Sequence, residues 1–381
     1  MRELLEAIAH EGHEHKSSPH LKDVDIFKPF FEDDDLVNLD EQDDGNCTRR
    51  ELVCRFLLLN AVLDQGPDME GVRQLLVSTL NTLYKKRIRI LHNPQLFFNN
   101  LDTAIETIDI VHDDVKRQRE QDWQSRNNSK KHYNLFVDGT SQTLSYAVFR
   151  WGTPLAIPLT LSNENNNPQP FVEFLKSFAS SEIMSHEIKD NKKYGLGKAI
   201  GDKAAHLFAK WITYSFPLLS SSVDDGWGQY SYEVPFDSNA GRVLWRTGFF
   251  LHFVTKKELK NKGFIQTKKG KKQKNYLRIT NCRGINISKN VKEVNKDKYN
   301  ELCVKCLKVA KKRPRKIEIQ RVPAAILYEE KKYSVGELDD GLMYIGTNFC
   351  FNHDNPKCSE CPLKDLCEGY KNKILITEYA T

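Results

Sequence analysis

The chain has 381 residues, of which 39% are hydrophobic and 28% charged, and its net charge is +6. This balance is typical of a globular protein of two or three domains, and because no run of 18 apolar residues occurs, no membrane span is expected. The N-terminus "MRELLEAIAHEGHEH" has no apolar core of a signal peptide, so we expect an intracellular protein whose nine cysteines stay reduced.

Charge is distributed unevenly along the chain. The first 45 residues carry 14 acidic and 4 basic side chains, whereas residues 256–316 carry 22 basic and 4 acidic ones. The basic block indicates a polyanionic partner, although lysines also keep an exposed insertion soluble, and charge alone leaves both readings open. Within the block, "TKKGKKQKN" predicts a turn or mobile loop that presents Lys268, Lys269, Lys271 and Lys272 to that partner.

The expected elements follow in chain order. Residues 1–48 are acidic and predict a loosely ordered segment. Helical spacing then begins at "TRRELVCRFLLLNAVLDQ", and a second helix, "DMEGVRQLLVSTLNTLYKK", is expected to start at Asp68 as its N-cap. Two further helical pieces are predicted across residues 93–123, the first opened by Asn93 and Pro94.

The pattern changes over residues 133–162, where β-branched and aromatic residues surround Asp-Gly and Gly-Thr-Pro. This predicts a β insertion or extended connections within 130–165. Helices resume at "FVEFLKSFASSEIM" and "DKAAHLFAKWITYSF", and a last helix is expected at "GELDDGLMYIGTNFC". We therefore predict a mainly α protein with inserted extended segments. Its expected parts are an acidic segment (1–48), a helical domain (49–254), a basic insertion (255–320) and a cysteine-containing region (321–381).

Four cysteines lie within 18 residues near the C-terminus, in the order Cys-x7-Cys-x2-Cys-x5-Cys. Zinc sites usually combine two separated CxxC pairs, whereas four thiolates in one compact loop also suit an iron–sulfur cluster. Scattered structural cysteines are the third reading. The candidate metal ligands are Cys350, Cys358, Cys361 and Cys367.

The stretch "CSECPLKDLC" resembles the iron–sulfur loop of the endonuclease III family of DNA glycosylases, which has one residue fewer in the first gap. The preceding "DDGLMYIGTNFC" resembles the helix that leads into that loop. The resemblance implies that the four cysteines hold a [4Fe-4S] cluster, with zinc as the alternative.

Two other stretches are similar to the catalytic half of the same superfamily. "GLGKAIGDKAAHLFAKWI" resembles its helix-hairpin-helix, with Ala199 in place of one hairpin glycine. The resemblance implies that Ile200 and Gly201 bring the backbone to a DNA phosphate and that Lys203 is the Schiff-base nucleophile. The alternative is an ordinary helix that starts at a glycine and carries a surface lysine.

The second stretch is "YEVPFDSNAGRVLWRTGFF", in which Asp237 matches the superfamily's catalytic aspartate at the start of a helix. Asp237 is also a good N-cap, and the two roles are compatible. Nearer the N-terminus, "LLLNAVLDQGPD" resembles the end of an early family helix. There Gln65 matches a glutamine that inserts into DNA when a base is flipped out, although Asp64 replaces the usual small residue. The alternative is a plain helix end followed by a turn.

The resemblance implies a DNA glycosylase of base excision repair, with or without AP-lyase activity, that acts on duplex DNA with a flipped base. It further implies a cytoplasmic, nucleoid-associated protein with no membrane partner. The rival is a non-lyase DNA-binding or DNA-modification-system protein on the same scaffold. Two roles remain open for four aromatic residues, which could stack on a flipped base or pack in the core: Trp211, Trp227, Trp245 and Tyr230. Metal binding also remains open for three further cysteines, Cys282, Cys303 and Cys306, and for the histidines at 10, 13, 15 and 20.

Overall fold

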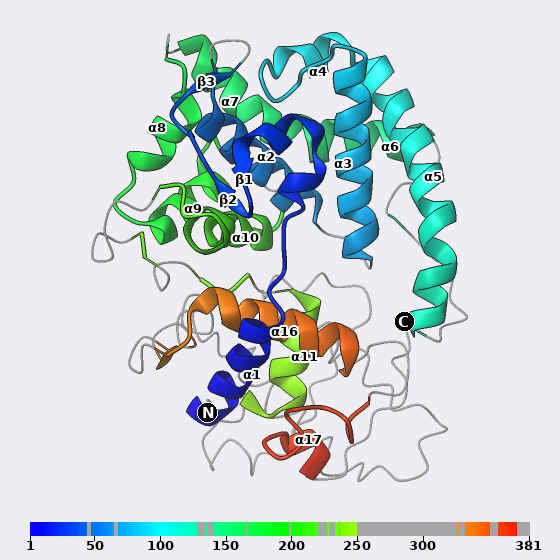
Figure 1. The fold of residues 1–381 in the computed structure, drawn as a ribbon, viewed down its shortest axis with the longest axis vertical. Helices are drawn as coiled ribbons and strands as arrows, with labels where there is room; N and C mark the ends of the chain where they lie inside the picture. The colour runs from blue at the N-terminus through cyan, green and yellow to red at the C-terminus, as the bar shows by residue number, and fades with distance from the viewer. Residues whose placement is uncertain are drawn as a thin grey trace. The chain divides into compact units, whose positions relative to one another are not determined.

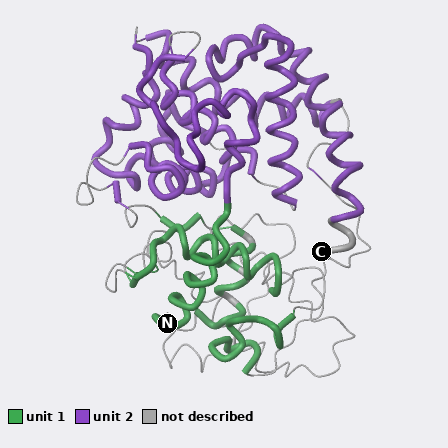
Figure 2. Tube along the Cα trace, viewed as in Figure 1, with its two compact units in different colours: residues 1–17, 127–129, 233–381 green, residues 18–126, 130–232 purple. Residues whose placement is uncertain are grey.

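The structure is a computed structural model. It describes residues 1–43, 47–64, 68–127, 135, 140–164, 167–197, 200–219, 227–228, 233–235, 237–249, 323, 326–327, 332–350 and 357–371. The chain divides into unit 1 (residues 1–17, 127–129 and 233–381) and unit 2 (residues 18–126 and 130–232), which Figure 2 colours green and purple. The described residues are mainly helical, which confirms the mainly α part of the predicted fold class. None of their helices is long and apolar enough to cross a bilayer.

Unit 2 is a set of helices around one central helix, and Figure 1 shows them from blue to green. The helices are α2 (Arg49–Leu63), α3 (Met69–Lys85), α4 (Gln95–Asn99), α5 (Leu101–Asn127), α6 (Thr140–Tyr146), α7 (Thr153–Glu164), α8 (Pro170–Lys176), α9 (Ser181–Asp190) and α10 (Asp202–Lys210), with π-helical turns η3 (Ala147–Gly152) and η4 (Trp211–Ser215).

Helix α2 is the centre of unit 2. It begins at Thr48, whose side chain accepts the Glu51 N–H, and every residue from Glu51 to Leu63 is buried. A helix that is apolar on all sides belongs in the interior. Its two buried charges satisfy each other: Arg55 Nη2 lies 2.7 Å from Glu51 Oε1. The Glu51 carboxylate also accepts the N–H groups of Phe171 (3.1 Å) and Val172 (2.8 Å), so it fixes the start of α8.

The extended insertion predicted within 130–165 is wrong where the structure describes it. Residues 140–164 form α6, η3 and α7, a continuous helical run. Buried Ala147, Trp151 and Leu155 recur every four residues, so burial of a helical face outweighs the β propensity of this segment. Pro154 is tolerated early in α7, and the π-helical turn η3 precedes it.

The expectation of a loosely ordered N-terminal segment is also corrected. Residues 18–43 form 3₁₀ turns at Leu21–Asp23 and Asp25–Phe30, followed by strands β1 (Phe31–Glu32), β2 (Asp35–Leu36) and β3 (Gln42–Asp43). Strand β1 pairs antiparallel with β2, and β3 pairs with β4 (Cys47–Thr48). The side chains of Val24, Phe27 and Phe30 are buried, and Asn60 of α2 donates to Pro19 O at 2.7 Å. Apolar anchors therefore hold this acidic stretch against α2.

Unit 1 contains α1 (Arg2–Glu14), α11 (Ser238–Arg246), α16 (Val335–Asn348) and the short α17 (Glu368–Lys371). Helix α1 packs along α16, as Figure 1 shows in blue and orange. The two backbones touch at glycines: a Cβ on Gly12 would lie 1.8 Å from Glu337 O, and one on Gly341 would lie 1.8 Å from Ile8 O. This packing assigns residues 1–17 to unit 1, so the division falls at 17/18 and not at the expected 48/49.

Two of the predicted helix starts show how far local capping rules apply. Ser334 and Glu337 form a capping box at the start of α16, the last helix predicted from the sequence. Asp68 lies at the N-cap of α3 as expected, but its side chain makes no capping hydrogen bond. Its carboxylate instead pairs with Arg119 of α5, at 3.0 Å from Nε and 2.8 Å from Nη2. A bidentate ion pair outcompetes a single cap bond in this buried setting.

Candidate active site and cysteine centre

The four cysteines of the C-terminal motif line one pocket in unit 1. The other walls are apolar side chains of α11, α16 and the cysteine loop, together with two basic residues. None of the four forms a disulfide, and all are partly buried. The thiols belong to Cys350, Cys358, Cys361 and Cys367, and the basic residues are Arg246 and Lys364. A set of four sulfur ligands around one space fits a cluster or a tetrahedral metal ion.

Burial raises the pKa of three thiols in this pocket. The pKa of Cys358 and of Cys361 rises to about 12, and that of Cys367 to about 11. An apolar surrounding disfavours the charged thiolate, and the neighbouring cysteines add to the effect. The Cys367 thiol also lies 3.4 Å from Arg246 O. Burial thus disfavours the thiolate form of Cys358, Cys361 and Cys367 as long as no metal is bound.

Arg246, the last residue of α11, is the main polar contact of the pocket. Its Nη1 lies 3.1 Å from Cys350 Sγ. Its carbonyl would lie 2.7 Å from a Cβ on Gly369, so a glycine is required where α17 passes the end of α11. The Glu368 N–H donates to Thr247 O at 3.2 Å. The cysteine loop is therefore anchored on the C-terminal end of α11.

The N-terminal end of α11 holds the predicted catalytic aspartate. Asp237 Oδ1 accepts the backbone N–H of Asn239 (2.8 Å) and of Ala240 (2.9 Å), so Asp237 is the N-cap that the sequence predicted. Asn239 in turn packs on Gly346 of α16, whose Cβ, if present, would lie 3.0 Å from Asn239 Cβ. Helix α11 thus carries Asp237 at one end and the contact to the cysteine loop at the other.

The predicted hairpin is a pair of packed helices in unit 2, α9 and α10. Lys189 of α9 donates to Gly197 O at 2.6 Å, and Gly197 has φ of +68°, a conformation that favours glycine. Ile200 is buried, and Gly201 is the exposed N-cap of α10. Among the described residues, no atom lies within 4 Å of a Cβ built on Gly201.

Lys203 lies in the first turn of α10. Its Nζ donates to the backbone carbonyl of Asp64 at 2.9 Å. Asp64 is the C-cap of α2, where backbone carbonyls lack helical partners. The amine is therefore held between the start of one helix and the end of another.

The Asp64 side chain is buried, with 2% of its surface exposed. Its Oδ2 accepts from Arg73 Nη2 at 3.4 Å, and its Oδ1 has no hydrogen-bond partner in the described part of the chain. Arg73 belongs to α3 and is also largely buried. The residue whose backbone carbonyl binds Lys203 thus has a buried side chain that contacts a largely buried arginine.

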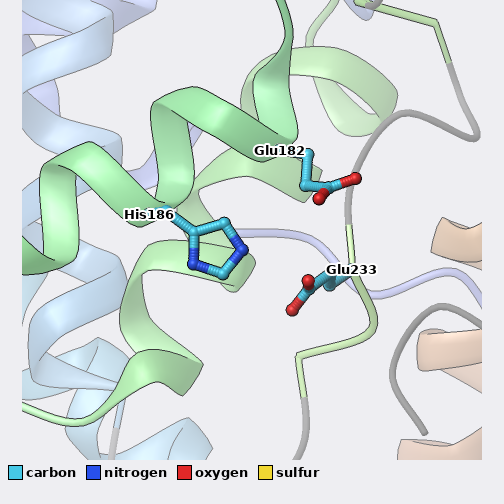
Figure 3. Close-up of side chains that lie close together, drawn as sticks. All are labelled: Glu182, His186 and Glu233. Atoms are coloured by element: carbon cyan, nitrogen blue, oxygen red, sulfur yellow. The ribbon is translucent and has the colours of Figure 1, made fainter. Parts of the chain in front are cut away.

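Unit 2 also carries Glu182 and His186 on one face of α9, a helical turn apart, as Figure 3 shows. Their ligand atoms lie within 4.8 Å of each other, and the His186 ring meets His206 of α10 edge to face, with centroids 5.7 Å apart. Glu233, the third residue labelled in the figure, is a buried residue of unit 1. Two ligand groups are fewer than a protein zinc site supplies.

The structure describes some of the remaining predicted residues, and the others lie outside its described part. Trp211 is fully buried, and buried Trp227 donates its indole N–H to Phe178 O at 3.2 Å, so both belong to the core. His13 binds Glu337 at 2.7 Å on an ordered helix rather than a mobile tail. Outside the described residues or side chains lie Gln65, Lys268, Lys269, Lys271, Lys272, Cys282, Cys303, Cys306, Tyr230 and Trp245.

The candidate residues fall in both units. Lys203 with Gly201 and Ile200 belongs to unit 2, whereas Asp237 and the four cysteines belong to unit 1. Sequence reasoning missed Arg246 and Arg73, because no local pattern marks an arginine whose partner is remote in the chain. No protein-family model, curated protein or solved structure matches the chain.

Proposed function

We propose that this protein is a DNA glycosylase that cleaves the N-glycosidic bond of a modified or damaged base, with Lys203 as the nucleophile. The observation that carries the proposal is the position of Lys203. It follows the open Gly201 turn by two residues, and its amine is fixed on a buried helix end. A nucleophile beside a backbone that a phosphate can approach is what attack on a nucleotide requires.

The proposed chemistry uses the neutral amine of Lys203. The amine attacks C1′ of the sugar, the glycosidic bond breaks, and the base leaves with the bonding electron pair and takes up a proton. Opening of the sugar ring and loss of the amine proton then give a Schiff base, from which elimination breaks the strand. Asp237 stabilises the positive charge that develops on the sugar.

We further propose that the cysteine pocket holds a [4Fe-4S] cluster, with Cys350, Cys358, Cys361 and Cys367 as ligands. The support is the donor set: four cysteine thiols that form no disulfide line one space, and a guanidinium N–H points at one sulfur. Bound there, a cluster would fix the C-terminal loop to α11. Zinc is the alternative occupant for the same ligands, and visible absorbance with iron analysis separates the two.

Borohydride trapping tests the nucleophile directly. Wild type and Lys203→Ala are incubated with duplexes that carry an abasic site or one of a panel of modified bases, and borohydride is added. A covalent adduct that the variant loses supports the proposal. Lys210→Ala is not a suitable control because Lys210 is buried, so Lys192→Ala, an exposed lysine in the turn after α9, is used instead.

Each remaining outcome names another function. Release of free base without an adduct indicates a glycosylase without lyase chemistry, in which Asp237 acts with water. DNA binding with neither adduct nor base release overturns the enzymatic proposal and favours a DNA-binding or DNA-modification-system protein.

A further inference from the structure

Unit 2 contains an open pocket of about 630 Å³ that the proposed reaction does not use. Its walls are the C-terminal end of α7, one side of α8 and the turn that follows α9. Pockets of roughly 300–1,000 Å³ are the sites in which proteins bind small molecules. We propose that this pocket binds an aliphatic diamine, an activity separate from the proposed glycosylase reaction.

The charged residues of the pocket walls indicate a cationic ligand. Among the described lining residues, the charged ones are Glu164, the last residue of α7, and Glu173 of α8. Both carboxylates are partly exposed to solvent, and the basic residues that contact them lie outside the described lining of the pocket. Two negative charges in one concave site attract a cation and repel an anion.

One of these carboxylates already binds an ammonium group. The Nζ atom of Lys193 lies 2.5 Å from Glu164 Oε1 and 5.1 Å from the centroid of the Tyr194 ring. The Tyr194 hydroxyl donates to the other oxygen of the same carboxylate, Oε2. The ion pair lowers the pKa of Glu164 and raises the pKa of Lys193. A carboxylate beside the face of an aromatic ring is suited to an alkylammonium ion, and Lys193 shows where the amine of a ligand would lie.

Lys193 is a weak competitor for this position, whereas the ring beside it is held in place. The Lys193 side chain is 58% exposed, and ion pairs between exposed side chains contribute little free energy. Tyr194 donates its backbone N–H to Asn191 Oδ1 at 3.0 Å, and its ring contacts Phe174 with centroids 5.2 Å apart. A ligand can therefore displace the Lys193 ammonium while the Tyr194 ring stays where it is.

The second carboxylate and the apolar part of the pocket favour a diamine over a monoamine. Glu173 Oε1 accepts from Gln169 Nε2 at 3.0 Å and lies 3.5 Å from Lys176 Nζ, another contact between exposed side chains. Apolar side chains line the pocket as well: Leu161, Pro170 and Phe174. A chain of methylene groups gains free energy by leaving water for such a surface. An amine at each end of that chain then matches one carboxylate each.

The inference predicts opposite effects for the two members of the ion pair. Lys193→Ala removes the competing ammonium, so affinity for a diamine should rise about threefold. Glu164→Gln removes the charged acceptor, so affinity should fall roughly 10-fold or more. If the ion pair served only to hold α7 against the turn after α9, both substitutions would act in the same direction.

The experiment is isothermal titration calorimetry of the full chain with three probes: diaminobutane and diaminopentane, each with two terminal amines, and butylamine. Wild type, Glu164→Gln, Glu173→Gln and Lys193→Ala are compared, and circular dichroism reports folding. Glu173→Gln should lower the affinity for the diamines to that for butylamine and leave butylamine binding unchanged. Lys192→Ala is the matched control, because Lys192 is the exposed lysine next to Lys193. It should leave all three affinities unchanged.

Tighter binding of a diamine than of butylamine, with the opposite shifts in Lys193→Ala and Glu164→Gln, supports the inference. It is overturned if wild type binds neither diamine at millimolar concentration, or if Lys193→Ala and Lys192→Ala have equal effects. Tighter binding of a lysine-containing peptide than of either diamine would also overturn it and would indicate a lysine side chain of a protein partner. Because the measurement contains no DNA, its outcome is independent of the proposed function.

Discussion

The guanidinium of Arg246 lies with Nη1 3.1 Å from Cys350 Sγ, and this contact joins two residues that are 104 positions apart in the chain. Helix α11 thereby reaches from its N-cap, Asp237, to the sulfur pocket. A hydrogen bond from a cation to a ligand sulfur stabilises the thiolate form that metals require and raises the potential of a bound cluster. The contact would therefore affect how tightly the pocket holds the proposed metal.

We expect Arg246→Gln to reduce metal retention by roughly 10- to 100-fold, the usual effect of losing a polar contact to a metal ligand. The measurement is the rate of loss of visible absorbance, or of zinc, in excess chelator. Lys364 lines the same pocket, so Lys364→Gln, which also removes one positive charge there, is the matched control. Equal losses in both variants would show that net charge acts and that the Arg246 contact does not.

Because the backbones of α1 and α16 touch at Gly12 and Gly341, we expect any side chain at these two positions to destabilise the protein. In Gly341→Ala the added Cβ meets Ile8 O at 1.8 Å, and backbone atoms cannot move aside cheaply. We expect a loss of about 1–3 kcal/mol in the free energy of unfolding, the usual cost of overpacking. Denaturant unfolding measures it. Thr347→Ala, at an exposed position of the same helix, should change stability by less than about 0.5 kcal/mol, and an equal loss there would refute the packing argument.

At Gly201, in contrast to Gly341, we expect an added side chain not to destabilise the protein. Its φ is −77°, a serine is a better N-cap than glycine, and the space around a Cβ is open. Gly201→Ser should therefore keep or slightly raise the melting temperature. In the proposed DNA complex the same side chain would separate a phosphate from the backbone N–H groups. We expect duplex affinity to fall roughly 10- to 100-fold, the equivalent of one charge-assisted hydrogen bond. Unchanged affinity, measured by fluorescence anisotropy at fixed salt, would exclude backbone approach at Gly201.

A pH dependence is predicted for the pair formed by His20 and Glu70, whose Nε2 and Oε2 lie 3.1 Å apart. The contact with Glu70 raises the pKa of His20 above 6.5, and the contact with His20 lowers the pKa of Glu70 from 4.5 to about 2. The histidine contribution is complete below pH 6.5 and is lost as the pH rises through the raised value. The glutamate contribution is complete above pH 4.5 and is lost as the pH falls towards 2.

Glu70→Gln should therefore destabilise the protein most between about pH 4.5 and 6.5. Both side chains are partly exposed, so we expect a difference of only about 0.5 kcal/mol. Urea unfolding at pH 3, 5.5 and 9, with a double-mutant cycle that includes His20→Asn, isolates the pair. A coupling that stays constant across these pH values would contradict the assignment, because neither group would then change its charge in the window.

Local pattern predicted the helical class and several element starts. The apolar spacing of α2 and α3, the N-cap role of Asp237 and the helix before the first cysteine of the motif all depend on residues within one or two turns of each other. Local pattern was misleading at 140–164, where β-branched and aromatic residues form helices, and at Asp68, whose carboxylate pairs with Arg119 instead of capping. In both places burial against other helices outweighs a propensity of about 1 kcal/mol or less per residue.

The sequence by itself determined the residue types of the candidate sites: four cysteines in a compact motif, a lysine after a glycine turn and an aspartate before a helix. Only the tertiary structure decided what surrounds them. It placed Lys203 on the carbonyl of Asp64, 139 residues away, with Arg73 behind that residue, and it placed Arg246 on Cys350. These contacts arise from helix packing, which brings together residues whose separation in the chain carries no local signal. Spacing therefore predicts the candidate groups, and packing sets the electrostatic environment on which their chemistry depends.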